Sequence, residues 1–459
     1  MLRRRSKKLI LLFFGDCFLL YLSLYATLFL RYSGTKDGDV IIARHFTPFT
    51  LVFVLWLLMF GAFGLFELRL MKNERHFLYR LLQAMALNIV FAVMIFYLIP
   101  VWAIEPRRNL FLIASLATAL IFSWRYLFNQ TIIRTGAAKV LFVGMPKEAV
   151  ALAEYLKENP QFGHRPVGFV TDQDLDAALR SAKPDTIVIS QHMKQDAQII
   201  RTLFRIVPQG IAVVEFSAFH EMLTGKIPLS LIGELWFLEN LIGTKKRFYE
   251  FFKRIIDSVL ALILAAIGLP FFPFICLAMI LSTPNEVFNY KQRRARPGDG
   301  IIFFRQKRVG RNGKEFDFIK LRSQRLGAEK ISAQIHEAKE IENDPRQYWV
   351  GKLLRKTYLD ELPQLWNVLK GEMSFVGPRP ERPQYVERFK EKVPFYEMRL
   401  LVPPGITGWA QINMENDASV EDAPEKMQYD LYYIKNRSLT LDLLIALRTL
   451  SALVRRQGR

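Results

Sequence analysis

Cysteine is nearly absent from this chain, with two among 459 residues, Cys17 and Cys276. Both lie within apolar runs, so the sequence excludes a disulfide framework of the kind that stabilises small secreted domains. Acidic residues are also in deficit, with 43 Asp and Glu against 63 Lys and Arg, which gives a net charge of +20 at pH 7. This excess favours an anionic partner, such as nucleic acid, an anionic lipid surface or a phosphorylated substrate.

Long apolar runs are abundant, and they favour the lipid and phosphorylated partners over nucleic acid. Hydrophobic residues make up 51% of the chain. Four runs approach the roughly 20 residues that span a bilayer, at 9–30, 49–68, 81–102 and 110–128. The first run is too long for a cleaved signal peptide. The sequence therefore predicts four transmembrane helices within residues 1–133.

Charge sets the expected orientation of these helices. The N-terminus and the 69–80 connection are basic, so the positive-inside rule places the N-terminus and everything after residue 128 in the cytoplasm. Asp16 lies early in the first run. It is either a functional intramembrane acid or a residue that sits near the interface or packs within the bundle.

A glycine fingerprint for dinucleotides is missing from the next part, residues 134–244. Short strand-like runs alternate there with helical patterns, which predicts a small Rossmann-like parallel α/β module. The first strand–helix turn reads Gly144-Met-Pro rather than G-x-G-x-x-G, so the close backbone approach to a pyrophosphate is not expected. We interpret the module as structural or regulatory, without a cofactor of its own.

A fifth apolar segment, residues 255–281, differs from the first four because Pro270 and Pro273 interrupt its middle. Basic residues flank it on both sides, at 245–254 and 291–296, and the positive-inside rule favours the cytoplasm for both flanks. A proline break supplies a bend at Pro270. The sequence predicts a re-entrant membrane helix, with a simple span and a soluble core helix as alternatives.

The chemistry is expected in residues 355–380, RKTYLDELPQLWNVLKGEMSFVGPRP. Asp360 and Glu361 precede a short helix that ends at Gly371, and their place at its start lowers the cost of negative charge by roughly 0.3–1 kcal/mol. Both are expected to be ionised at neutral pH. An ionised Asp can attack phosphorus, and Mg²⁺ binds carboxylates together with substrate phosphates. Asp360 could instead merely cap the helix.

Basic residues surround this pair in the sequence. Asn312-Gly313 predicts a β-hairpin over residues 301–322, which is rich in Lys and Arg. Arg379 lies between two prolines, where its guanidinium is suited to grip a phosphate. A glycine-rich turn follows at residues 403–411, after Arg399.

Five stretches resemble the bacterial polyprenyl-phosphate sugar-1-phosphate transferases. They are KRIID at 253–257, the hairpin from FFRQ at 303–306 through Gly313, LDELPQL at 359–365, MSFVGPRP at 373–380 and PGITGWAQ at 404–411. The sequence DLYY at 430–433 and Asp442 complete the set. The preceding runs and module look like the large polytopic branch of this family, which initiates exopolysaccharide, capsule or O-antigen synthesis.

The resemblance implies that a nucleotide diphosphate sugar, such as a UDP-hexose, donates sugar-1-phosphate to undecaprenyl phosphate and releases nucleoside monophosphate. Asp360 would be the nucleophile that forms a phospho-Asp intermediate, and Glu361 would hold Mg²⁺ beside it. Four basic side chains match motif positions expected at the substrate phosphates: Lys320, Arg322, Arg355 and Arg379. Arg399, which precedes the glycine-rich turn, is predicted to bind a substrate phosphate as well. The break at Pro270 matches the bend of the family's re-entrant helix.

We therefore predict an α/β membrane protein in three parts. Residues 1–133 form a four-helix transmembrane bundle, 134–244 the Rossmann-like module, and 245–459 an α+β monotopic catalytic domain. The expected location is the bacterial inner membrane, with the catalytic domain on the cytoplasmic face. The expected partners are membrane lipids and a second copy in a homodimer, and nucleic acid is excluded. The alternatives are a non-catalytic scaffold of a polysaccharide assembly complex, a nucleotide-sugar epimerase or dehydratase, and direct one-step transfer.

Overall fold

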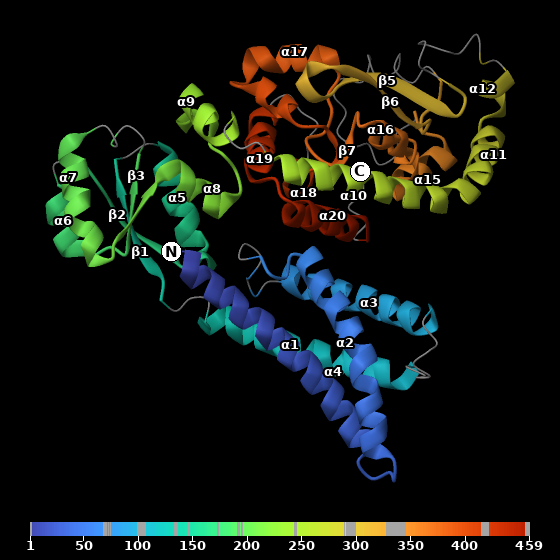
Figure 1. The fold of residues 1–459 in the computed structure, drawn as a ribbon, viewed down its shortest axis with the longest axis horizontal. Coiled ribbons are helices and arrows are strands. Elements are labelled where there is room, and N and C mark those ends of the chain that lie inside the picture. The colour runs from blue at the N-terminus through green and yellow to red at the C-terminus, as the bar shows by residue number, and fades with distance from the viewer. Residues whose placement is uncertain are drawn as a thin grey trace. The chain divides into compact units, whose positions relative to one another are not determined.

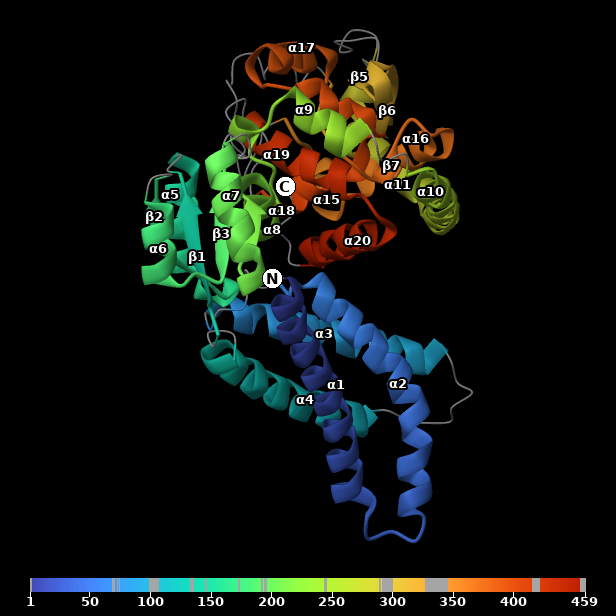
Figure 2. The same ribbon diagram turned by 60° about the vertical axis from the view of Figure 1, so that its left-hand side comes forward.

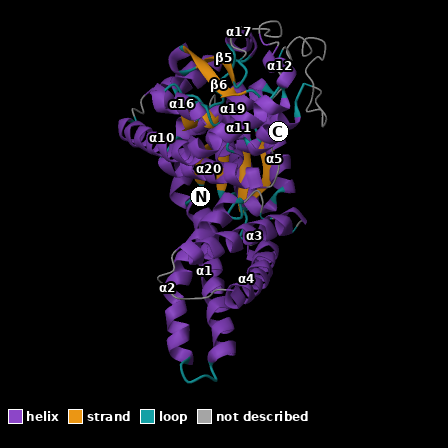
Figure 3. Ribbon diagram, turned by 90° about the vertical axis from the view of Figure 1, so that its right-hand side faces the viewer, coloured by secondary structure: helices purple, strands orange, loops and turns teal. Residues whose placement is uncertain are grey.

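The fold comes from a computed structural model that describes residues 2–67, 71, 73, 75–98, 107–132, 136–144, 147–171, 174–190, 193, 196–242, 246–288, 290, 300–326, 346–414 and 422–454. The chain divides into two compact units, Met1–Thr224 and Gly225–Arg459. Helix dominates both units, and strands are few and short (Figure 3).

Four long helices form the first part of the first unit (Figure 1): α1 (Leu2–Tyr32), α2 (Gly38–Ala62), α3 (Arg75–Leu98) and α4 (Arg107–Leu127). Each contains a window long and apolar enough to cross a membrane. Helix α2 begins well before the apolar run that starts at residue 49, and Pro48 lies inside the helix without ending it. The turn before α2 requires glycine, since a Cβ on Gly38 would lie 2.2 Å from the carbonyl oxygen of Tyr32.

A buried ion pair joins α1 to α4. The Arg125 side chain donates from Nε to Asp16 Oδ1 at 3.2 Å and from Nη1 to the carbonyl oxygen of Leu65. The rings of Phe60 and Phe66 lie against the same guanidinium. Asp16 and Arg125 are 0% and 2% exposed. Of the interpretations offered for Asp16, the structure supports packing within the bundle.

The rest of the first unit is a three-layer α/β module, as predicted. Its parallel strands lie in the order β2-β1-β3-β4. Their bounds are β1 (Ala138–Val143), β2 (His164–Val170), β3 (Thr186–Ile189) and β4 (Ala212–Glu215). Helices α6 (Leu175–Ala182) and α7 (Ala197–Ile206) cover one face, and α5 (Lys147–Glu158) and α8 (Phe216–Thr224) lie on the other (Figure 1). Of the turn Gly144-Met-Pro, the described residues include Gly144 alone.

The fifth apolar segment lies in the second unit and consists of α10 (Arg247–Gly268), the turn η9 (Leu269–Phe271) and α11 (Phe272–Ser282). Helix α11 leaves the line of α10 at the turn that contains Pro270 (Figure 1). The protein buries 6% of the apolar window of this segment, against 28–39% for the other four windows. The basic flank at 291–296 lies outside the described residues.

The remainder of the second unit packs around the hairpin of β5 (Phe303–Val309) and β6 (Glu315–Leu321), which turns at Asn312 and Gly313 as predicted. A second small sheet pairs β7 (Ser374–Val376) in parallel with β8 (Gly405–Thr407). Figure 2 views α10 nearly end-on, with α16 and β7 beside it. The other helices are α9 (Glu234–Phe237), α12 (Pro284–Phe288), α15 (Trp349–Thr357), α16 (Gln364–Lys370), α17 (Pro383–Lys392), α18 (Trp409–Asn413), α19 (Ala423–Asn436) and α20 (Leu439–Val454).

The second unit begins earlier than the predicted boundary at residue 245. Ile227, Trp236 and Phe237 share a buried core with Met427 and Leu431 of α19. No glycine-rich or charged linker marks the end of the α/β module in the sequence, so these apolar residues could belong to either side. Packing against α19 assigns residues 225–242 to the second unit.

Candidate active site

The acidic pair lies at a sharp turn between two helices. Helix α15 ends at Tyr358, which has a left-handed backbone with φ of 56°. The short 3₁₀ turn η11 (Leu359–Glu361) follows and leads through Pro363 into α16, which ends at Gly371 with φ of 83°. The predicted helix and its glycine cap are confirmed. Neither η11 nor α16 has a side-chain cap, so Asp360 does not serve as a helix cap.

Asp360 is 6% exposed, whereas Glu361 is half-buried, so the two carboxylates occupy different environments. Burial raises the pKa of Asp360 to about 6, and Glu361 adds to the rise. Lys320 and Arg355 oppose it. The helix start was expected to favour ionisation, but desolvation dominates. At pH 7 Asp360 remains mostly ionised and is more basic than an ordinary aspartate.

Lys320 and Arg355 supply positive charge around Asp360. Lys320 lies on β6, which neighbours η11, and its ammonium lies 5.3 Å from the centroid of the Phe304 ring. Burial lowers the pKa of Lys320 to about 8; Asp360 and Glu361 oppose the shift, and Arg355 adds to it. The structure therefore brings together four of the predicted site residues, Lys320, Arg355, Asp360 and Glu361.

Arg379 is held by a loop that packs backbone against backbone. A Cβ on Gly405 would lie 2.1 Å from the backbone nitrogen of Gly377, and a Cβ on Gly408 would lie 2.3 Å from the Gly377 carbonyl oxygen. Glycine is therefore required at these crossings. The half-buried Arg379 side chain contributes to the positive field at Arg308 on β5, and Arg308 in turn contributes to the field at Lys320.

A family model described as bacterial sugar transferase matches residues 295–456. A Bacillus subtilis (strain 168) protein, provisionally named undecaprenyl-phosphate N-acetylgalactosaminyl 1-phosphate transferase, is 40% identical over 159 residues, which are 35% of this chain and 78% of that protein. The chain belongs to the bacterial sugar transferase family. The resemblance found in the sequence motifs is confirmed.

Two longer sugar transferases match more of the chain. An Aeromonas hydrophila protein named UDP-N-acetylgalactosamine-undecaprenyl-phosphate N-acetylgalactosaminephosphotransferase is 36% identical over 256 residues, 55% of each chain. A Xanthomonas campestris pv. campestris protein named UDP-glucose:undecaprenyl-phosphate glucose-1-phosphate transferase is 31% identical over 335 residues, 68% of this chain and 65% of that protein. The chain spans about half the length of the first of these relatives.

Arg322 is engaged by several protein groups. Its guanidinium pairs with Glu286, donates to Thr283 Oγ1 at 3.0 Å and donates to the carbonyl oxygen of Ile301 at 2.8 Å. Its own carbonyl accepts a hydrogen bond from Tyr348. The side chain is 4% exposed. We assign it to bracing the hairpin against α12, so this geometry does not favour its predicted contact with a phosphate.

Arg399 is also engaged away from solvent. Its guanidinium lies 2.9 Å from Asp430 Oδ2, donates to the Tyr396 hydroxyl and donates to the Arg379 carbonyl oxygen at 2.9 Å. It lies 3.9 Å from Glu381 and is 3% exposed. Its predicted contact with a phosphate is likewise not favoured by this geometry.

Part of the family signature fixes the fifth apolar segment to the helix that follows the acidic turn. Arg254 on α10 donates to the carbonyl oxygens of Val368 and Leu369, which end α16. Lys253 donates to Asp442 at 2.8 Å. Asp257 accepts weakly from the Phe375 backbone N–H at 3.5 Å. These motif residues hold α10 against α16, α20 and β7, a role that the sequence alone does not reveal.

Arg308 is the neighbour of the site that the sequence did not single out. It donates to the Pro380 carbonyl oxygen at 2.9 Å and lies 3.8 Å from Glu381. Burial lowers the pKa of Arg308 to about 10; Glu381 opposes the shift, and Arg379 adds to it. In the sequence, Arg308 does not differ from the other basic residues of the hairpin. The one sequence feature that could have indicated the place of Arg308 is the hairpin register, which puts it opposite Phe316 on β6.

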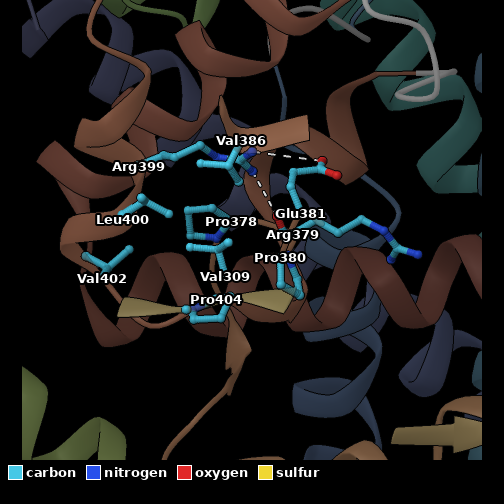
Figure 4. A pocket seen from close by; sticks show the side chains of 11 residues that line it. Val309, Pro378, Arg379, Pro380, Glu381, Val386, Arg399, Leu400, Val402 and Pro404 are labelled. Carbon is cyan, nitrogen blue, oxygen red and sulfur yellow. Dashed lines mark hydrogen bonds and ion pairs between the residues drawn. The ribbon is translucent and has the colours of Figure 1, made fainter. Parts of the chain in front are cut away.

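A hollow lies beside the Gly-Pro-Arg-Pro loop, lined by Val309, Arg399 and Pro404 among others (Figure 4). It has room for about one water molecule. Asp360 does not line it.

The acidic pair fits Mg²⁺ as a partial site. Within the described residues, no group of three or more His, Cys, Asp or Glu side chains gathers for a metal. Two adjacent carboxylates nevertheless supply the hard oxygen ligands that Mg²⁺ prefers, and Mg²⁺ commonly completes its shell with water and substrate phosphate.

Proposed function

We propose that this protein transfers sugar-1-phosphate from a UDP-sugar to undecaprenyl phosphate, through a covalent intermediate on Asp360. The observation that carries this proposal is a buried carboxylate with a raised pKa, flanked by Lys320 and Arg355. A buried, mostly ionised aspartate among cations is suited to attack a phosphorus atom that itself carries negative charge. The names of the relatives support the donor and the acceptor.

The reaction divides into two displacements at the same phosphorus. A carboxylate oxygen of Asp360 first forms a bond to the sugar-linked phosphorus, and the bond from that phosphorus to the bridging oxygen breaks, so nucleoside monophosphate leaves with that oxygen. An oxygen of undecaprenyl phosphate then attacks the phospho-sugar and releases the Asp360 carboxylate. Lys320, Arg355 and Arg379 stabilise the negative charge that builds on the phosphoryl oxygens.

Glu361 would hold Mg²⁺ next to Asp360, and the ion would neutralise phosphate charge when bound. Asp360 could contribute a second oxygen to the same ion. The half-buried position of Glu361 suits this role, because the ion needs room for phosphate and water ligands.

Placement in a membrane follows from the apolar surfaces. Helices α1–α4 would span the bilayer, and α10–α11 would enter and return through the bend at Pro270. Phe274 and Leu281 of α11 are 72% and 69% exposed, which suits contact with lipid rather than water. Both ends of this segment would then lie on the cytoplasmic face of the inner membrane, where Asp360 meets a nucleotide sugar and the lipid phosphate together.

The names of two relatives give undecaprenyl phosphate as the acceptor, which supports a lipid-linked product. We propose the same step for this chain, the first membrane step in making an exopolysaccharide, capsule or O-antigen, with a homodimer as the working assembly.

The test is an assay of the full-length protein in nanodiscs with undecaprenyl phosphate and a panel of UDP-sugars. We expect wild-type protein to release UMP, and to retain a labelled phospho-sugar when the lipid is left out. Asp360→Asn is expected to abolish both. Asp317→Asn is the matched control, because this side chain of β6 is 57% exposed, and it is expected to behave as wild type. Turnover by Asp360→Asn at the control's rate would refute the nucleophile assignment. Release of UMP only when lipid is present, without a labelled enzyme, would favour direct transfer.

A further inference from the structure

The loop that carries Arg379 is anchored at four consecutive carbonyl oxygens. The Pro378 oxygen accepts from Gly405 N at 2.9 Å, and the Glu381 oxygen accepts from Val309 N at 2.9 Å. Between them, the Arg379 oxygen accepts from Arg399 Nη2 at 2.9 Å, and the Pro380 oxygen accepts from Arg308 Nη1 at 2.9 Å. Because the anchors come from three separate stretches of the chain, at residues 308–309, 399 and 405, the loop has little room to shift.

Arg399 is itself held by side chains on the side away from the loop. Asp430 on α19 lies 2.9 Å from its guanidinium and is 2% exposed. Tyr396 accepts another of its hydrogen bonds. Burial raises the pKa of Glu381, but Lys426, Arg399 and Arg308 outweigh burial and hold that pKa below its usual value. Arg399 is therefore committed to protein partners beneath the loop.

The side chain of Arg379 leaves the loop in another direction. Figure 4 shows Arg399 approaching the loop from one side, while the Arg379 guanidinium extends away from Arg399 and from the small hollow. Arg399 thus holds the backbone of Arg379 at its carbonyl oxygen, and the guanidinium projects beyond the loop. The flanking prolines restrict the same backbone further, because their φ angles are fixed.

We propose that Arg399, held by Asp430, is a positioning residue that aims Arg379 at the substrate phosphate, and that it does not contact the phosphate itself. This inference rests on the proposed function in one respect, the contact between Arg379 and a phosphate. A displacement of about 1 Å in such a group can cost about 10²-fold in rate. Positioning by Arg399 is therefore expected to matter even though its side chain is buried away from the ligand.

A double-mutant cycle on the full-length protein in nanodiscs tests the inference. Its corners are wild type, Arg379→Ala, Arg399→Lys and the double variant. Lysine keeps the charge opposite Asp430 but lacks the fork that reaches Asp430 and the Arg379 carbonyl together. The readouts are the Kd for UDP and kcat/KM for UMP release from UDP-N-acetylgalactosamine. We expect Arg379→Ala to lower kcat/KM by about 10²-fold. Arg399→Lys alone is expected to lower kcat/KM by about 10-fold.

The decisive quantity is the effect of Arg399→Lys in the Arg379→Ala background. If Arg399 acts through Arg379, Arg399→Lys is expected to lower kcat/KM by less than about 2-fold in the Arg379→Ala background. Equal losses in both backgrounds would overturn the proposal, because a direct phosphate contact or a general structural defect predicts them. A neutral Arg379→Ala would overturn it as well. Lys390→Met, on the exposed surface of α17, is the control and is expected to change neither readout.

A second variant covers the case in which Arg399→Lys fails to fold. Arg399→Met combined with Asp430→Leu replaces a buried ion pair by apolar side chains of similar size, which is often neutral for stability. Glu381 keeps a cationic partner in this variant, because Lys426 Nζ lies 2.6 Å from Glu381 Oε1. We expect this variant to keep the wild-type Tm and to lose UDP affinity only when Arg379 is present. A wild-type UDP affinity at that Tm would count against the proposal.

The cycle also separates this inference from the proposed function. If no UDP-sugar yields UMP with wild-type protein, the proposed function fails, but the Kd for UDP still reports the coupling between Arg399 and Arg379. If UMP is released and the coupling is absent, the proposed function stands and the positioning role fails.

Discussion

The raised pKa of Asp360 makes the first half of the proposed reaction unusually sensitive to acid. Asp360 attacks as the carboxylate, so kcat/KM is lost as the pH falls through its pKa in the unliganded protein. With a pKa of about 6 in place of 3.8, the ionised fraction falls from about 90% at pH 7 to about 10% at pH 5. An ordinary aspartate would remain about 90% ionised at pH 5. The expected tenfold fall between pH 7 and 5 therefore distinguishes the two cases.

Lys320 sets the alkaline side of the same profile. It acts as the cation, and burial lowers its pKa to about 8, so its contribution is lost as the pH rises through about 8. We expect a bell-shaped profile centred near pH 7. The assay is rapid-quench release of UMP at low donor concentration without undecaprenyl phosphate, because a phosphate monoester titrates near pH 6 and would obscure the acidic limb.

Two substitutions move the acidic limb in opposite directions. Glu361 raises the pKa of Asp360, second only to burial, so Glu361→Gln is expected to shift the acidic midpoint downward by on the order of one pH unit. Lys320 lowers that pKa, so Lys320→Met is expected to shift the midpoint upward and to remove the alkaline limb. Both variants are slower, but the shape of the profile is the measured quantity. A wild-type midpoint below pH 5, or shifts of the same sign in the two variants, would refute the assignment.

Three further predictions concern how the fold supports the site. Arg125→Ala leaves Asp16 buried without its partner and is expected to destabilise the protein by about 3–5 kcal/mol in thermal unfolding, whereas Arg125→Met with Asp16→Leu recovers most of the loss. Arg254→Ala removes both donors from the end of α16 and is expected to cost about 2–3 kcal/mol, with Ser258→Ala as a milder control on the same helix; equal Tm values would count against this bracing role. Gly405→Ala forces a Cβ to within 2.1 Å of the backbone of residue 377 and is expected to lower both Tm and UDP affinity, while Gly233→Ala, with nothing within 4 Å, leaves both unchanged.

The sequence predicted those parts of the fold that depend on local pattern. The hairpin followed from Asn312-Gly313, and Asn312 and Gly313 do adopt positive φ. The α/β module followed from the alternation of strands and helices, and the short helix after Asp360 ends at Gly371 as expected. Each of these features is decided by neighbours in the chain, so the sequence exposes it.

The sequence could not predict side-chain roles and pKa shifts that depend on residues far away in the chain. The sequence grouped Arg322 and Arg399 with the phosphate-binding residues because all are basic and near the motifs. Their carboxylate partners, Glu286 and Asp430, are 36 and 31 residues away in sequence, and nothing local links them. The direction of the Asp360 pKa shift was missed for the same reason, since burial by the surrounding fold outweighs the local effect of a helix start.

Helix α10 combines an exposed apolar surface with basic residues that contact the rest of the second unit. Exposed side chains such as Ile256 and Ile263 cover one surface of α10. Residues close to them in sequence turn inward, where Arg254 caps α16 and Lys253 pairs with Asp442. Because α16 begins three residues after Glu361, any tilt of α10 is transmitted to the acidic turn through a few hydrogen bonds. We therefore interpret the family signature at 253–257 as the set of contacts that fixes the position of Asp360 relative to the apolar surface of α10. On the proposed function, that position decides whether Asp360 can reach a phosphate attached to a lipid.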